Sequence, residues 1–128
     1  MRAVMICLLA SAWVAGCSGK PQAATGAPVP PAAAPATEVA ASWVGKWTGP
    51  EGTYLEIATQ DGAYSVTISN LDGPRTFAAK PGSASLDFER DGTTERIRAT
   101  DGPGTGMKWL ATKTDCLVVS TGEGFCRD

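Results

Sequence analysis

The side chains that most often do chemistry in enzymes are sparse in this chain. It contains four cysteines and no histidine, which removes the Ser–His and Cys–His nucleophile pairs and the commonest general base. Paired carboxylates remain, and Asp87 and Glu89 lie two residues apart. They alternate with Leu86 and Phe88, a spacing that places both carboxylates on the water-facing side of a half-buried strand. We therefore expect no catalytic residue and no enzyme activity.

Two glycine-bearing patterns also fail as ligand sites. Gly102, Gly104 and Gly106 alternate as in a phosphate loop, but residues 107–112 are predicted to be a strand, not the helix whose N-terminus would hold the phosphate. The Asp-Gly turns lack the clustered oxygen ligands of a calcium loop. We expect neither a metal nor a cofactor.

The N-terminus has the layout of a secretory signal peptide. One arginine follows the first methionine, and then comes the uncharged run AVMICLLASAWVAG, residues 3–16. This run is shorter than the about 20 apolar residues that span a bilayer. A positive start, a short apolar stretch and small residues at its end favour export.

The end of this segment, Val14-Ala15-Gly16-Cys17, resembles the lipobox of bacterial lipoproteins, in which an aliphatic residue and two small residues precede a cysteine. The resemblance implies that residues 1–16 are removed and that the Cys17 thiol carries a lipid. Two or three acyl chains would anchor the protein firmly, since one chain binds only marginally. The alternative is an ordinary signal with a chance cysteine, cut after Ala12 or Ala15.

Ser18 follows the cysteine. In Gram-negative lipoproteins of this type a residue other than Asp at that position implies export to the outer membrane, facing the periplasm. Loss of residues 1–16 removes Arg2 and leaves 10 basic against 13 acidic residues, a formal charge of −3. Because the net charge is negative and the basic residues are scattered, we expect neither a nucleic-acid-binding surface nor a polybasic membrane-binding patch. The expected partners are the membrane, through the anchor, and an envelope protein or polymer.

The two remaining cysteines are predicted to form a disulfide. If Cys7 leaves with the signal and Cys17 is acylated, Cys116 and Cys126 remain in an oxidising compartment and should pair. They are equidistant from Thr121, so we expect them to face each other across a hairpin. The alternative is a two-thiol metal site, but the chain supplies neither a histidine nor a second cysteine pair for it.

Residues 17–42 are predicted to be a lipidated linker. Positions 18–42 hold five Pro and nine Ala among 25 residues and no aromatic side chain, too little apolar bulk to offset chain entropy. We expect a disordered, extended tether. The alternative is an Ala-rich helix over Thr37 to Trp43, where we expect only a short turn.

Residues 43–128 are predicted to form one all-β domain. Asp-Gly or Pro-Gly turn signals recur every nine to eleven residues, at positions 61, 72, 81, 91 and 101. Apolar and polar residues alternate between them, as expected of an antiparallel up-and-down meander. About eight strands are predicted, over or near residues 53–59, 63–69, 75–80, 86–89, 96–99, 107–112, 116–120 and 125–127. Such strands must close into a barrel or stack as two sheets to hide their apolar faces.

The start of this domain, Gly45-Lys46-Trp47, resembles the opening of lipocalin and avidin-like barrels, where Gly-x-Trp begins the first strand and the Trp plugs one end. In lipocalins an Arg near the end of the barrel packs on that Trp. The resemblance implies a small calycin-type barrel in which Arg127 contacts Trp47.

Large aromatic side chains are predicted to fill the narrow barrel, because an eight-strand interior is just filled by side chains. They are Trp47, Tyr54, Tyr64, Phe77, Phe88, Trp109 and Phe125. We therefore expect recognition by the outer surface, by an anchored binding or accessory module. The alternative is an inhibitor of lysozyme or another cell-wall hydrolase. The layout resembles the lipid-anchored lysozyme inhibitors, with Ser83-Ala84-Ser85 as a local echo of their inhibitory loop, and an acidic domain suits a basic lysozyme.

Overall fold

The computed structural model describes residues 35–128. Cys7, Cys17, the signal peptide and most of the predicted tether lie outside the described residues. No described helix is long and apolar enough to cross a membrane.

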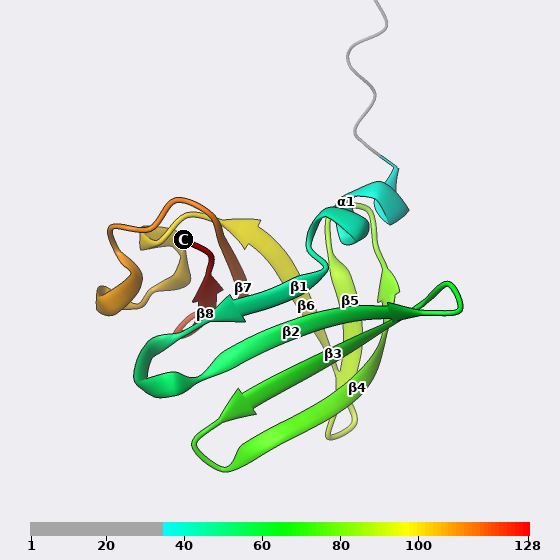
Figure 1. The fold of residues 1–128 in the computed structure, drawn as a ribbon, viewed down its shortest axis with the longest axis horizontal. Coiled ribbons are helices and arrows are strands. Elements are labelled where there is room, and N and C mark those ends of the chain that lie inside the picture. The colour runs from blue at the N-terminus through cyan, green and yellow to red at the C-terminus, as the bar shows by residue number, and fades with distance from the viewer. Residues whose placement is uncertain (1–34) are drawn as a thin grey trace, which may run out of the picture. The chain divides into compact units, whose positions relative to one another are not determined.

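Eight antiparallel strands follow one another around a closed barrel, and each pairs with its neighbours in the sequence (Figure 1). The strands are β1 (Gly45–Thr48), β2 (Tyr54–Gln60), β3 (Ala63–Asn70), β4 (Gly73–Pro81), β5 (Leu86–Arg90), β6 (Thr93–Thr100), β7 (Cys116–Ser120) and β8 (Glu123–Cys126). The predicted all-β up-and-down meander and its closure into a barrel are confirmed. Short 3₁₀ segments lie between strands: η1 (Pro50–Gly52), η2 (Pro103–Thr105) and η3 (Lys108–Leu110).

The Asp-Gly pairs make tight turns where the sequence predicts them. Asp61 and Gly62 have φ of 53° and 79° between β2 and β3, and Asp91 and Gly92 repeat these values between β5 and β6. Two successive positive φ angles match the right-handed twist of the flanking strands, and Asp and Gly tolerate them. The turn residues therefore fix where β2 and β5 end and where β3 and β6 begin.

The prediction of a strand over residues 107–112 is wrong. This segment lies in the long β6–β7 loop and contains η3. The loop turns at Gly106, whose φ is 71°, and it buries Leu110 while exposing Trp109. The alternation of apolar and polar residues in this segment does not predict that it folds back onto the barrel as a loop. The eighth strand is β1 instead, at the Gly-x-Trp sequence.

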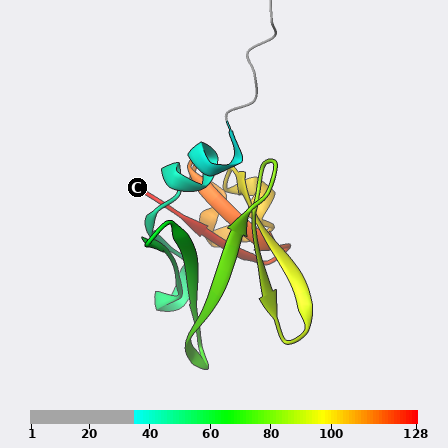
Figure 2. The same cartoon turned by 90° about the vertical axis from the view of Figure 1, so that its right-hand side faces the viewer.

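A seven-residue helix, α1 (Ala36–Ser42), lies where only a short turn is predicted. It covers one end of the barrel (Figure 2). Ala40 is fully buried in the core, and the Tyr64 hydroxyl donates to the Thr37 carbonyl at 3.1 Å. The helix is stabilised by this packing against the barrel, which outweighs the low apolar bulk of the local sequence. The predicted boundary at residue 43 thus falls after the first packed element.

The barrel interior is filled by large side chains from every part of the sheet. Those least exposed include Trp47, Leu55, Ile57, Val66, Leu86, Ile97 and Leu117. The rings of Phe77 and Phe88 lie 5.2 Å apart between their centroids. Inward residues alternate with outward ones along β2, β3 and β5, so the period-two pattern predicts most of this core.

A second apolar cluster lies apart from the main core. It consists of Leu110, Cys116 and Cys126, with Met107 packed against it. In β7 the alternate residues Leu117 and Val119 belong to the main core instead. The cysteines therefore lie on the outer face of the β7–β8 hairpin, and the β6–β7 loop covers them.

Candidate functional site

One mouth of the barrel is closed by Trp47 and Arg127. The Trp47 side chain is only 1% exposed, and its Nε1 donates to the Trp43 carbonyl at 2.8 Å. The Arg127 guanidinium lies 3.7 Å from the centre of the Trp47 ring. It also donates to the carbonyls of Trp43 and Val44 at 3.0 and 2.8 Å. The predicted contact between Arg127 and Trp47 is confirmed.

An ion pair between two non-adjacent strands lies at the opposite mouth. Arg90, at the end of β5, donates to both carboxylate oxygens of Glu123, at the start of β8, at 2.7 and 2.8 Å. It also contacts Glu95 at 3.2 Å. Hydrogen bonding to Glu123 is the main cause that raises the pKa of Arg90. This bidentate geometry joins β5 to β8, which share no backbone pairing.

Cys116 and Cys126 form the predicted disulfide. They are direct register partners in the β7–β8 hairpin, as their symmetric placement about Thr121 predicts. Among residues 35–128 no group of three potential metal-ligating side chains is gathered.

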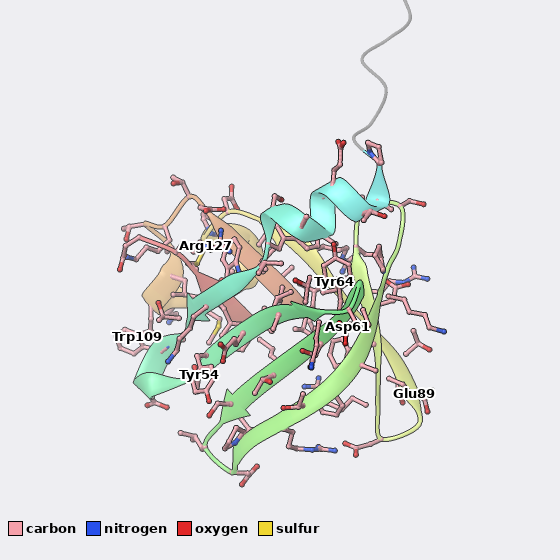
Figure 3. All side chains as sticks on the ribbon, turned by 45° about the vertical axis from the view of Figure 1, so that its right-hand side comes forward. Tyr54, Asp61, Tyr64, Glu89, Trp109 and Arg127 are labelled. Atoms are coloured by element: carbon pink, nitrogen blue, oxygen red, sulfur yellow. A yellow bond between two sulfur atoms is a disulfide. The ribbon has the colours of Figure 1, made fainter. Side chains whose placement is uncertain are left out.

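The two carboxylates considered for catalysis lie on the outer surface of β5. Asp87 accepts a hydrogen bond of 2.5 Å from the Ser85 hydroxyl, and its other oxygen lies 3.5 Å from Nε of Arg96. Glu89 is exposed and lies at the periphery of the molecule (Figure 3). Asp87 thus already has a serine and an arginine as partners. The strand pattern correctly predicts that the Asp87 and Glu89 side chains both face outward.

Trp109 does not fill the barrel, contrary to prediction. It is 80% exposed and lies outside the strands, at the edge of the molecule (Figure 3). Tyr54 is also outside, where the Lys46 ammonium lies 4.1 Å from its ring centre. Of the seven aromatics, Trp47, Tyr64, Phe88 and Phe125 are buried in the main core, and Phe77 packs against it partly buried.

The loop that carries Trp109 is firmly held. Thr105 is fully buried, and its hydroxyl donates to the Gly102 carbonyl at 2.6 Å. The Gly102 amide donates to the Lys113 carbonyl at 2.8 Å. The neighbour of Trp109, Leu110, is buried against the disulfide. The exposed indole of Trp109 is therefore carried by a loop that hydrogen bonds and packing hold in place. The amino-acid composition does not predict this arrangement.

Two surface hollows flank β5. One, of about 380 Å³, is lined by the loop of residues 82–85 with Asp87, Arg96 and Arg98. The other, of about 420 Å³, is lined mainly by β4 and β5, including Lys80 and Glu89. Both share Asp87. The sequence singled out Ser83-Ala84-Ser85, but it did not place this loop beside two arginines.

Comparison with models of known families, with curated proteins and with solved structures found no match.

Proposed function

We propose that the chain is a lipid-anchored lipoprotein of the bacterial cell envelope, whose barrel domain is a non-catalytic module that binds an envelope protein through its outer surface. The observation that carries the proposal is the contrast between a filled, closed barrel and an exposed Trp109 on a fixed loop.

The filled interior argues against an internal ligand. Barrels that carry small molecules need room between their inward side chains. Here Trp47, Leu55 and Leu86 occupy the interior with almost no exposed surface. Arg127 covers one mouth and the Arg90–Glu123 pair spans the other. Binding is thus left to the outer surface.

Trp109 is the feature of that surface best suited to a protein partner. Trp is enriched among the residues that carry most of the binding energy in protein interfaces. An indole already held by its loop loses little conformational entropy on binding. Among residues 35–128 the other large, exposed apolar side chains are Val44, between α1 and β1, and Leu71, in the β3–β4 turn.

The anchor is supported by residues 14–17. The apolar run delivers a cysteine at its end, small residues precede that cysteine, and a Pro/Ala-rich segment follows. The Arg127–Trp47 contact supports the calycin-type resemblance, which rests on the Gly-x-Trp sequence and the meander. Export to the outer membrane remains part of the proposal.

The partner is tested by crosslinking and capture from envelope extracts, with the full chain in neutral detergent as bait. We expect one envelope protein to be enriched, and Trp109→Ala to reduce its recovery at least tenfold. Leu71→Ala removes an apolar side chain of similar exposure, 78%, and serves as the matched control. Equal recovery with both variants would exclude Trp109 as the contact.

An inhibitor of lysozyme or another cell-wall hydrolase is the second candidate. Ser83 and Ala84 are exposed in a loop that lines a surface hollow, as an inhibitory loop requires. Arg96 and Arg98 line the same hollow, and they would repel a basic enzyme, so this candidate stays second. A turbidity assay of lysozyme on cell-wall suspensions separates the two, since a surface-binding module leaves the clearing rate unchanged.

A further inference from the structure

The hollow beside residues 82–85 combines positive charge with hydrogen-bond donors. Arg96 and Arg98 are two residues apart on β6, and both are exposed, with fully buried Ile97 between them. Their side chains therefore leave the same, outer face of the barrel. Both line the hollow of about 380 Å³.

The single acidic residue of this hollow is already partnered. Asp87 accepts from Ser85 through one carboxylate oxygen and lies near Arg96 through the other. The Arg98 side chain forms no hydrogen bond or ion pair with any of residues 35–128. One acidic and two basic side chains leave the hollow with a net charge of +1, in a chain whose formal charge is −2.

The loop opposite the arginines is tightly built. The Gly82 amide donates to the Ser85 carbonyl at 2.8 Å. A Cβ at Gly82 would displace the Ser85 hydroxyl from its place beside Asp87, because it would collide with that hydroxyl and approach the Asp87 carboxylate to 3.2 Å. The amides of Ser83 and Ala84 donate to no backbone carbonyl of the described residues. These two amides and the Ser83 hydroxyl remain available as donors.

We propose that this hollow binds the phosphate group of a sugar phosphate. A planar guanidinium pairs with two phosphate oxygens at once, and loop amides with a hydroxyl supply further donors, as in many phosphate sites. The hollow is within the size range of small-ligand sites, so it has room for a sugar beside the phosphate. The source is a free sugar phosphate or the phosphorylated headgroup of a glycolipid.

The binding test is calorimetric titration of the full chain in dodecyl maltoside. The probes are glucosamine 1-phosphate, inorganic phosphate and, as a neutral control, glucosamine brought to the same ionic strength with NaCl. We expect saturable binding of the sugar phosphate, weaker binding of phosphate, and none of the control. Absence of saturable heat with both phosphate probes would overturn the proposal.

Variants locate the site. Arg98→Gln should weaken binding of glucosamine 1-phosphate at least fivefold, because it removes the unpartnered guanidinium without disturbing Asp87. Arg75→Gln is the matched control, since Arg75 is an exposed arginine bound to Asp91 and does not line this hollow. If both variants bind equally, the site is not here.

A second readout needs no variant. Phenylglyoxal modifies exposed guanidinium groups, and mass spectrometry measures the rate at each arginine. Glucosamine 1-phosphate should slow modification of Arg98 at least threefold and leave Arg75 unaffected, whereas equal rates at Arg98 with and without the probe would contradict the proposal.

The source of the ligand is tested by comparing the binding of a phosphorylated glucosamine lipid, in mixed micelles, with that of the free sugar phosphate. Tighter binding of the lipid identifies a headgroup as the source, and equal binding identifies a free ligand.

Discussion

The guanidinium of Arg127 lies 3.7 Å from the centre of the Trp47 ring, across the seam between the last strand and the first. The seam itself is narrow, because β1 and β8 share a single register pair, Thr48 with Cys126. Arg127 also donates to the carbonyl of Ser42, the last residue of α1, and to those of Trp43 and Val44. One side chain therefore joins the helix, the first strand and the end of the last strand.

Arg127→Met should lower the free energy of unfolding by about 2 kcal/mol, because it removes a sheltered cation–π contact and charged hydrogen bonds. Arg127→Lys should lose less, since the charge remains but the fork of donors does not. Urea titration followed by circular dichroism measures both. Arg75→Met, which removes an exposed guanidinium 5.2 Å from the Phe77 ring, is the control and should change the midpoint only slightly, because Arg75 and Asp91 are exposed. An unaltered midpoint in Arg127→Met would show that the seam does not depend on this residue.

Replacement of both Cys116 and Cys126 by Ser should lower stability by about 2–3 kcal/mol, the value expected for closing a short loop. Because the bridge packs against Leu110 and Met107, the loss should also loosen the β6–β7 loop. Hydrogen exchange should therefore rise in residues 101–115 before it rises in β2 and β3. Peptide mapping of the non-reduced protein checks the bridge itself, and two free thiols there would refute the pairing.

Asp91 is predicted to titrate below its ordinary range. Arg75 donates to its two oxygens at 2.6 and 3.1 Å, and this hydrogen bonding lowers the pKa of Asp91 below the ordinary value of 3.8. A carboxylate whose pKa is lower in the folded state stabilises the protein above its unfolded pKa, and that contribution is lost as the pH falls through the folded pKa. Both groups are exposed, so the effect on stability is small.

The titration is measured by carbon-detected NMR of the Asp91 carboxyl. Arg75→Gln should return its pKa towards 3.8. Asp72, which has no ion pair among the described residues, serves as the reference carboxylate in both proteins. An Asp91 titration that is identical with and without Arg75 would contradict the interpretation.

Cys17→Ser should abolish lipidation, because a serine hydroxyl cannot form the thioether. Detergent phase partitioning with labelled palmitate measures the change. The wild type is expected in the detergent phase with label, and the variant in the aqueous phase without it. A labelled variant that still partitions with detergent would refute the lipobox interpretation, while Cys7→Ser is the control and should behave as the wild type.

The sequence predicts those elements whose cause is local. Asp61-Gly62 and Asp91-Gly92 define turns, and alternation around Val66 and Phe88 predicts which side faces the core. The missed elements have tertiary causes. Helix α1 depends on packing against Tyr64, and no local pattern announces that partner.

The candidate sites divide in the same way. The pairing of Cys116 with Cys126 and the contact of Arg127 with Trp47 are predictable from spacing and from resemblance. The exposure of Trp109 and the convergence of Arg98 with the loop at Ser83 are not, because each depends on how a loop folds back across the outside of the barrel. Contacts between a loop and a distant strand produce no periodic pattern of residue types in the sequence.

The narrow seam between β1 and β8 also bears on how the chain folds. The hydrogen-bond partners of Arg127 lie up to 85 positions before it in the chain. All the other strand pairs of the barrel join neighbours that one turn or loop connects. Contacts between distant positions form slowly, because the chain must lose the entropy of closing a long loop before the contact can stabilise it. Barrel closure should thus be the late step in refolding. Until it occurs the edges of β1 and β8 remain open to a second chain, so exchange of the terminal strand between two copies is the expected misfolded product at high concentration.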